Sequence, residues 1–184
     1  MKIEYPVEYL QLAIDIARLR SRFSGNVYAL GTDKHRGDGE DRISWLGVMG
    51  ELIGNLACVR FKEEGVIESF TSAPLLAYTP QPGPDMTIKY ISWDKYCYID
   101  VKCTEKSAFN INEHSHNRDD GIDTYMLIHI DGRWDKKHST YIPVSQQASF
   151  EIVSHNDVNL WEVKTGFNNY YSRAVQNGHI DSSS

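Results

Sequence analysis

Hydrophobic residues recur at helical spacing in two stretches near the start of the chain. A helix is predicted over residues 5–22, and a second helix over residues 43–61. The residues that line the apolar side of each are Leu10, Ala13, Ile14 and Ala17 in the first, and Leu46, Met49, Ile53, Leu56 and Ala57 in the second. Both stretches are therefore expected to bury one side against the rest of the protein.

The second predicted helix contains three glycines, Gly47, Gly50 and Gly54. A glycine inside a helix costs about 1 kcal/mol relative to alanine. Because the three glycines lie near one stripe of the helix, we expect close packing against another element along that stripe. Glu51 lies on or beside this stripe, so its carboxylate points toward the element on which the helix packs.

Two β-rich runs, residues 85–91 and 96–103, are separated by a short polar turn and predict a hairpin. Alternation along the second run divides its side chains between two faces. Cys97, Ile99, Val101 and Cys103 share the apolar face, and Tyr96, Tyr98, Asp100 and Lys102 share the other. If the loop has an even number of residues, Asp85 shares the face of Asp100 and Lys102. A slip of one residue would reverse this arrangement.

The rest of the chain predicts further strands and helices. A short helix followed by a loop is expected over residues 105–121, and strands over residues 123–130 and 139–144. Ser145 is a candidate N-cap for a helix that ends near residue 153. One more strand and a terminal helix are expected after it. This order predicts an α/β fold, in which a mixed central β-sheet is flanked by helices on both faces of a single domain, residues 1–184.

Composition limits the possible partners. The net charge of -6 argues against a protein that binds polyanions through bulk charge, but it does not exclude a local basic groove. The predicted loop over residues 31–42 contains Lys34, His35 and Arg36. No apolar run approaches the roughly 18 residues that a membrane span needs, and the N-terminus lacks the pattern of a signal peptide. Three cysteines at scattered positions favour reduced thiols and a cytoplasmic location.

Three short segments together carry a resemblance to a known family. Glu51 is placed on the second helix, Pro84-Asp85 begins the hairpin, and Asp100-Val101-Lys102 lies on its second strand. This order of a helical glutamate, Pro-Asp and (D/E)-x-K resembles the PD-(D/E)XK nuclease superfamily. The resemblance covers about residues 41–131. It implies a restriction-endonuclease-like core, to which the N-terminal helix and the C-terminal elements are added.

The resemblance also implies a metal-dependent reaction on DNA. Asp85, Asp100 and the carbonyl of Val101 would hold Mg²⁺, for which Mn²⁺ is expected to substitute, because oxygen atoms are its preferred ligands. Glu51 would bind the same ion through water or help to hold a second one. Lys102 would orient or help to deprotonate the attacking water and stabilise developing charge. The expected protein is a small DNA endonuclease of restriction, phage or repair type.

Further partners follow from the same hypothesis. Lys34, His35, Arg36 and Thr104 are the candidate nucleic-acid contacts. A chain of this length has little room for a separate recognition domain, so cutting both strands of a duplex is easiest for a homodimer with two active sites.

Other interpretations stay open. Glu162-Val163-Lys164 repeats the (D/E)-x-K pattern without Pro-Asp upstream, and we interpret it as an exposed structural pair. His114 and His116 form an H-x-H pattern that suits a metal site, although a polar loop is the simpler interpretation. The alternatives to a nuclease are a non-catalytic relative that binds nucleic acid or protein, and an unrelated α+β interaction protein with Asp100 and Lys102 as a surface pair.

Overall fold

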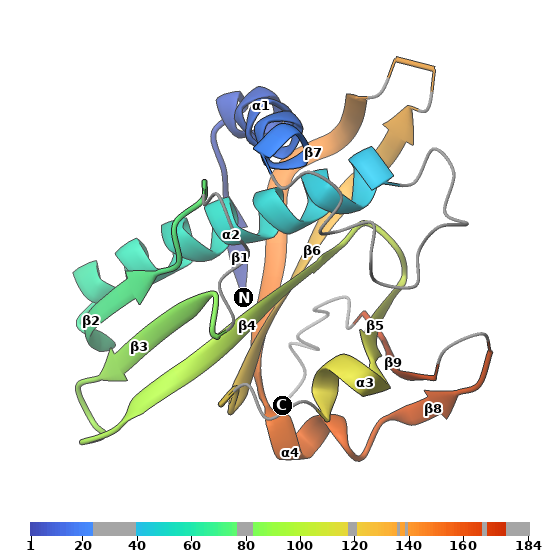
Figure 1. Ribbon diagram of the computed structural model, residues 1–184. Helices are drawn as coiled ribbons and strands as arrows, with labels where there is room; N and C mark the ends of the chain where they lie inside the picture. Colours follow the sequence, from blue (N-terminus) through green and yellow to red (C-terminus); the bar gives the residue numbers. More distant parts are fainter. Residues whose placement is uncertain are drawn as a thin grey trace, which may run out of the picture.

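Thirteen helices and strands make up the part of the chain that the structure describes. The computed structural model describes residues 1–23, 40–76, 83–117, 121–135, 137–138, 140–166 and 169–175. Figure 1 shows two longer helices above a curled sheet, with a smaller sheet and two short helices at the lower right.

The larger sheet has six strands in the order β1-β7-β6-β4-β3-β2. Its strands are β1 (Lys2–Glu4), β2 (Ile67–Ser72), β3 (Met86–Tyr90), β4 (Tyr96–Thr104), β6 (Thr124–Asp135) and β7 (Thr140–Ser154). Strands β4 and β6 run parallel, and all the other neighbours in this sheet are antiparallel. The prediction of a mixed sheet is therefore confirmed.

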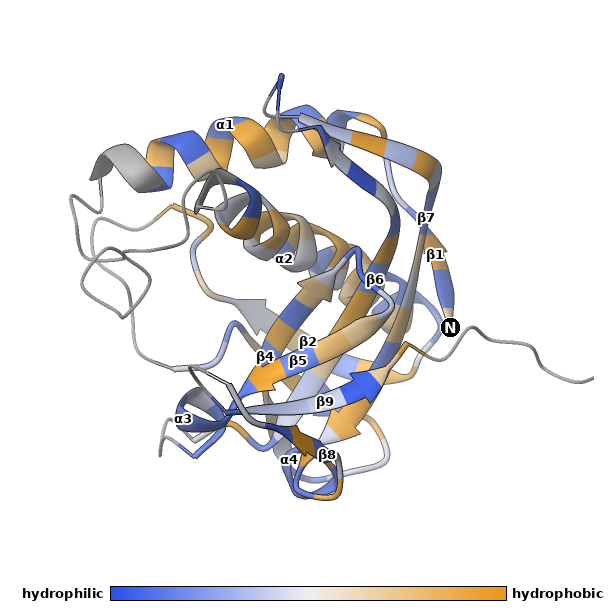
Figure 2. Cartoon of the chain, turned by 90° about the vertical axis from the view of Figure 1, so that its right-hand side faces the viewer, coloured by the Kyte–Doolittle hydropathy of each residue, from blue (hydrophilic) through white to orange (hydrophobic). Residues whose placement is uncertain are grey.

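One face of this sheet is covered by α1 (Glu8–Phe23) and α2 (Glu40–Glu63). The two helices lie side by side in both views (Figures 1 and 2), and hydrophobic residues alternate with hydrophilic ones along them, as expected for helices that bury one side. Ile99 and Val101 of β4 and Met126 of β6 belong to the core beneath these helices. We call this side the helix face of the sheet.

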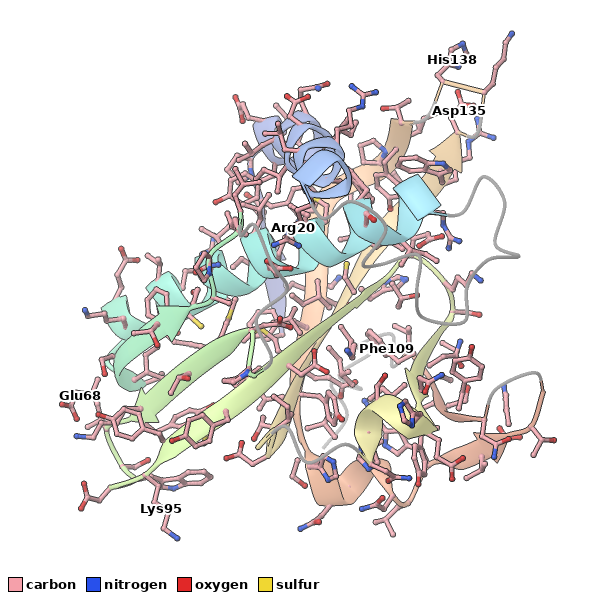
Figure 3. The ribbon with its side chains drawn as sticks, in the orientation of Figure 1. Arg20, Glu68, Lys95, Phe109, Asp135 and His138 are labelled. Atoms are coloured by element: carbon pink, nitrogen blue, oxygen red, sulfur yellow. The ribbon has the colours of Figure 1, made fainter. Side chains whose placement is uncertain are left out.

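The opposite side, which we call the far face, carries a second and smaller core. There β5 (Ala108–Asn112), β8 (Glu162–Lys164) and β9 (Tyr170–Ala174) form a three-stranded sheet in the order β5-β9-β8. The short helices α3 (Glu113–His116) and α4 (His155–Val158) lie beside it. Phe109 of β5 points toward the larger sheet (Figure 3) and shares a cluster with Tyr125 and Leu127 of β6. Helices therefore lie on both faces, but on the far face they are single turns.

The hairpin forms in the register that places Asp85 and Asp100 on the same face. Met86 is paired with Ile99, and Thr87 with Tyr98, in an antiparallel ladder. One step beyond Met86, the residue opposite Asp100 is Asp85. Cys97, Ile99 and Val101 are buried on the helix face, as their alternation predicted.

Three predicted elements are wrong. Residues 145–153 belong to strand β7 and not to a helix that Ser145 would cap. The segment after β4 begins with strand β5 before the single turn of α3. Described residues after 160 form β8 and β9, which pair with each other, and the terminal helix expected there is not found among them.

These predictions failed because each segment pairs with a strand that is distant in sequence. The pattern of β7 is irregular because its pairing with β6 is interrupted. Ile130 is paired with Ala148 but Gly132 with Pro143, so residues 144–147 have no partner on β6. Strand β1 pairs with residues 147–149. Strand β1 itself was not predicted. Its three residues add an edge to the sheet, and Phe150 N–H donates a hydrogen bond to the carbonyl of Met1. Long-range pairing of this kind has no signature in local periodicity.

No helix within the described residues is long and apolar enough to cross a membrane.

The glycines of α2 differ in what surrounds them. A Cβ at Gly50 would lie 2.9 Å from the Cβ of Cys103 and 3.2 Å from the Cγ1 of Val101, so helix and strand approach closely there. A Cβ at Gly54 would lie 2.7 Å from the Cε of Met86. A Cβ at Gly47 would meet no atom within 4 Å. The predicted close packing is thus confirmed for Gly50 and Gly54 and wrong for Gly47.

We expect Gly50→Ala to lower the free energy of unfolding by about 1–2 kcal/mol, because overpacking against β4 outweighs the gain in helix propensity. Gly47→Ala is the matched control in the same helix. It should raise the free energy of unfolding by up to about 1 kcal/mol. Urea denaturation of both variants measures the difference, and equal effects at the two positions would contradict the close approach of α2 and β4.

Candidate active site

Asp100 and Lys102 lie on the far face of β4 and bind each other. The Nζ of Lys102 is 2.7 Å from one carboxylate oxygen of Asp100 and 3.0 Å from the other. The Asp100 side chain is 23% exposed and the Lys102 side chain 35%, so this pair lies at the boundary between core and solvent. The predicted (D/E)-x-K pair is thus a half-buried ion pair and not a fully solvated one.

Asp85 is held against the same strand by its side chain. Its Oδ2 accepts a hydrogen bond of 2.8 Å from the backbone N–H of Val101. Extending the β3–β4 register by two residues puts Pro84 opposite Val101. Because proline has no N–H, it cannot donate to the Val101 carbonyl, which points to the same side of the strand as the Val101 N–H. The Pro-Asp dipeptide therefore ends the ladder, with a carboxylate placed beside the Val101 peptide.

The pKa of Asp85 is raised to about 7. The largest cause is burial, which disfavours the ionised form, and the next is the negative charge of Asp100. The hydrogen bond from Val101 opposes these effects, and Glu51 adds a smaller repulsion. Asp85 is thus close enough to both Asp100 and Glu51 to be affected by their charges. Two adjacent carboxylates of this kind are best satisfied by a proton or a cation between them.

Glu51 is bound by a residue that the sequence did not identify. Arg20 of α1 donates to both carboxylate oxygens of Glu51, at 2.8 and 2.6 Å. The Nε of Arg20 also donates to the Leu75 carbonyl at 2.6 Å. Arg20 lies between α1 and α2 in Figure 3. The helical glutamate is therefore near the Asp85 carboxylate but is already part of an ion pair.

Tyr125 is the other neighbour that the sequence did not identify. It is paired with Asp100 across β4 and β6 and is 2% exposed. Burial and the charge of Asp100 raise the pKa of Tyr125. Its hydroxyl is 2.9 Å from the Nδ1 of His116, whose Nε2 is 2.9 Å from the Oδ1 of Asn159. His116 also stacks on His155, with ring centroids 3.7 Å apart.

This network bears on the H-x-H pattern. His116 is 1% exposed and both of its ring nitrogens have protein partners. Burial lowers the pKa of His116, which favours the neutral ring. His114 lies on the same single turn, α3. Within the described residues, His116 thus joins the small sheet to β6, and a metal site at this pattern finds no support.

The remaining predicted residues fall in different places. Thr104 ends β4 on the face of Asp100 and Lys102, and its Oγ1 accepts a hydrogen bond from the Lys106 N–H. Lys34, His35 and Arg36 lie outside the described residues. Glu162 and Lys164 are 3.9 Å apart on exposed strand β8, so the interpretation as a surface pair is confirmed.

Two side-chain carboxylates, and not three, are left as candidate ligands for a divalent cation. In the described part of the chain no group of three or more histidine, cysteine, aspartate or glutamate side chains is arranged to hold a metal ion. The Glu51 carboxylate is paired with Arg20. Asp85 and Asp100 with the Val101 carbonyl remain as oxygen donors, and the raised pKa of Asp85 shows that a positive charge would be favourable there. An ion such as Mg²⁺ commonly binds through one or two carboxylates and keeps several waters.

Comparisons with known proteins give little to add. No protein-family model matches the chain, and no curated protein matches its sequence. Among solved structures, one similar chain is a Holliday junction resolvase, Hjc, from the archaeal hyperthermophile Archaeoglobus fulgidus. The two chains share 12% identity with a TM-score of 0.38, and the match covers 66% of this chain and 84% of the resolvase. At this TM-score the similarity decides neither fold nor function.

The raised pKa of Asp85 predicts how stability depends on pH. Because the folded state binds this proton more tightly than the unfolded chain does, stability in EDTA should fall as pH rises from about 4 to about 7. The slope contributed by one group is at most about 1.4 kcal/mol per pH unit. Asp85→Asn removes the titrating group and should flatten this fall.

Urea denaturation at several pH values measures the effect. Asp94→Asn, which changes an exposed carboxylate in the β3–β4 turn, is the matched control and should leave the wild-type slope. Parallel pH profiles for the wild type and Asp85→Asn would show that Asp85 titrates as an ordinary carboxyl.

We also expect Arg20→Ala to lower the free energy of unfolding by about 3 kcal/mol, because Glu51 would keep a largely buried charge without its partner. The double variant Arg20→Met with Glu51→Leu removes both charges and should recover most of this loss.

Lys164→Ala is the control: it breaks the exposed pair on β8 and should change the free energy of unfolding by less than about 0.5 kcal/mol.

A double-mutant cycle from thermal or urea denaturation gives the coupling energy between Arg20 and Glu51. Zero coupling would contradict the bidentate pair.

Proposed function

We propose that the protein is a metal-dependent nuclease that hydrolyses phosphodiester bonds in DNA. The observation that supports it most is the Asp85–Asp100 carboxylate pair beside Lys102, on the face of β4 where the β3–β4 ladder ends. Two adjacent carboxylates, one of which has a raised pKa, favour a bound cation, and the ammonium group beside them favours a bound phosphate. The resemblance to the PD-(D/E)XK superfamily supports the same assignment of residues.

Hydrolysis requires a water oxygen to attack phosphorus while the bond from phosphorus to the leaving oxygen breaks. Asp85, Asp100 and the Val101 carbonyl would hold Mg²⁺ or Mn²⁺, which supplies positive charge to the phosphate and a more acidic water. The attacking water must then be placed and lose its proton, and the added negative charge on the phosphate oxygens must be stabilised.

Lys102 is in place for the first and the last of these tasks, because its ammonium group donates hydrogen bonds and does not accept a proton. The proton of the attacking water would pass to bulk water. The Nζ of Lys102 binds both oxygens of Asp100, so its position follows that carboxylate. With a cation bound to Asp100, this ammonium group would donate to a phosphate oxygen or orient the water. Tyr125 is paired with Asp100 across β4 and β6, and its hydroxyl is hydrogen-bonded to His116. In this proposal Tyr125 therefore stabilises the sheet and does not contact the reacting atoms.

Glu51 has a smaller part in this proposal. Its bidentate pair with Arg20 leaves it as a charge near Asp85 that favours a cation between the carboxylates. A homodimer would supply two such sites for the two strands of a duplex.

The test is cleavage of supercoiled, linear and branched DNA with Mg²⁺ or Mn²⁺. The wild type should cut at least one form, and Asp100→Ala and Lys102→Ala should lower the rate at least about 100-fold, since each removes charge stabilisation. Lys164→Ala, at the same triplet pattern on β8, is the control and should cut like the wild type.

Ca²⁺ binding by calorimetry gives a second measurement that does not depend on cutting. Ca²⁺ should bind the wild type and not Asp100→Ala. If no DNA is cut and Ca²⁺ binding is absent or unchanged in Asp100→Ala, Asp100 and Lys102 are an ordinary strand pair and the proposal is wrong.

A further inference from the structure

Two exposed tyrosines precede the carboxylate pair on the same strand. Tyr96 and Tyr98 are 54% and 43% exposed, although Cys97 and Ile99 between and beside them are buried. Strand alternation places both rings on the far face, in line with Asp100. Successive side chains on one face of a strand are about 7 Å apart. The row Tyr96, Tyr98, Asp100 therefore runs from the hairpin tip to the candidate active site.

The hairpin extends beyond the rest of the sheet at these tyrosines. Strand β6 begins at Thr124, one residue after Asp123, whose backbone N–H donates to the Tyr98 carbonyl. The end of the hairpin projects past the start of β6 (Figure 1). Because the first β4–β6 pair is Ile99 with Thr124, Tyr96 and Tyr98 lie on this end, and Lys95 lies at its tip (Figure 3).

A cation accompanies the two rings. Lys89 of β3 is paired with Tyr96 across the ladder and lies on the same face. Its Nζ is 2.8 Å from the Glu68 carboxylate, and the Glu68 side chain is 56% exposed. Exposed pairs of this kind contribute little to stability, so Lys89 can exchange Glu68 for another anion at small cost. Lys89 and Lys102 thus lie at opposite ends of the row formed by the tyrosines and Asp100.

We propose that Tyr96 and Tyr98 are a stacking surface for the bases of an unpaired DNA strand, with Lys89 near its phosphates. This inference rests on the proposed function, because a DNA strand that is cut beside Asp100 would continue along β4 to these tyrosines. In a duplex each base is covered by its neighbours, whereas an unpaired base offers its face to an aromatic ring. The site would therefore prefer DNA with a single-stranded segment beside the cut.

The experiment measures binding without cleavage. The Kd of fluorescein-labelled oligothymidine is measured in CaCl₂ by anisotropy, beside the Kd of the same oligothymidine annealed to oligoadenine. Tyr98→Ala should weaken single-strand binding on the order of tenfold, and Tyr96→Ala with Tyr98→Ala by more. Duplex binding should change less than about twofold, since its bases are covered.

Two control variants separate stacking from folding. Tyr98→Phe keeps the aromatic face and should bind oligothymidine like the wild type. Leu160→Ala changes a side chain that is 84% exposed in the connection between α4 and β8, and this variant should bind normally. Thermal melting of each variant excludes unfolding as the cause of a loss.

The possible results separate this inference from the proposed function. Equal loss for single strand and duplex, no loss in Tyr98→Ala, or no binding of oligothymidine by the wild type would each overturn the stacking surface. Metal-dependent cutting that persists with any of these results leaves the nuclease in place. Selective loss in Tyr98→Ala, together with no cutting of any DNA and no Ca²⁺ binding that depends on Asp100, would support the stacking surface and overturn the nuclease.

Discussion

The register of the β3–β4 hairpin is the constraint on which the candidate site depends. Because Met86 is paired with Ile99, the next residue on each strand places one carboxylate opposite another, Asp85 beside Asp100. A shift of one residue would turn Asp85 to the helix face and leave Asp100 alone with Lys102. The burial of Met86 and Ile88 on the helix face prevents that shift, since it would put their side chains on the far face.

The close approach of α2 to β4 serves the same arrangement. Gly50 lets the helix backbone contact the strand at Cys103 and Val101, and Glu51 follows directly. The helix thereby brings a third carboxylate near Asp85, and this charge would be unfavourable without Arg20. The bidentate pair with Arg20 offsets one of three neighbouring negative charges, and Lys102 offsets another. Asp85 is left with a raised pKa because burial and its neighbours disfavour its charge.

Much of this could be predicted from local pattern. The two long helices, the hairpin and the face shared by Asp85, Asp100 and Lys102 all follow from periodicities of a few residues. What could not be predicted depends on partners distant in sequence. Residues 145–153 became a strand because β6 and β1 pair with it, and Arg20 reaches Glu51 from a separate helix. Tyr125 of β6 contacts His116 of α3 through tertiary packing, which no spacing in the sequence shows.

The exposed tyrosines of β4 fit the same physical account. A strand whose helix face is fully apolar must place its polar or aromatic residues on the other side, and β4 uses that side for two rings, a carboxylate and an ammonium group in succession. Where β6 is paired with β4, this side lies beside Tyr125 and is half-buried, which raises the energetic effect of each charge. Where the hairpin projects past β6, the same side is open to solvent, and the tyrosines there expose aromatic area that contributes little to folding. The boundary between these two environments falls between Tyr98 and Asp100, so one strand supplies both a half-buried charged segment and an exposed aromatic segment next to it.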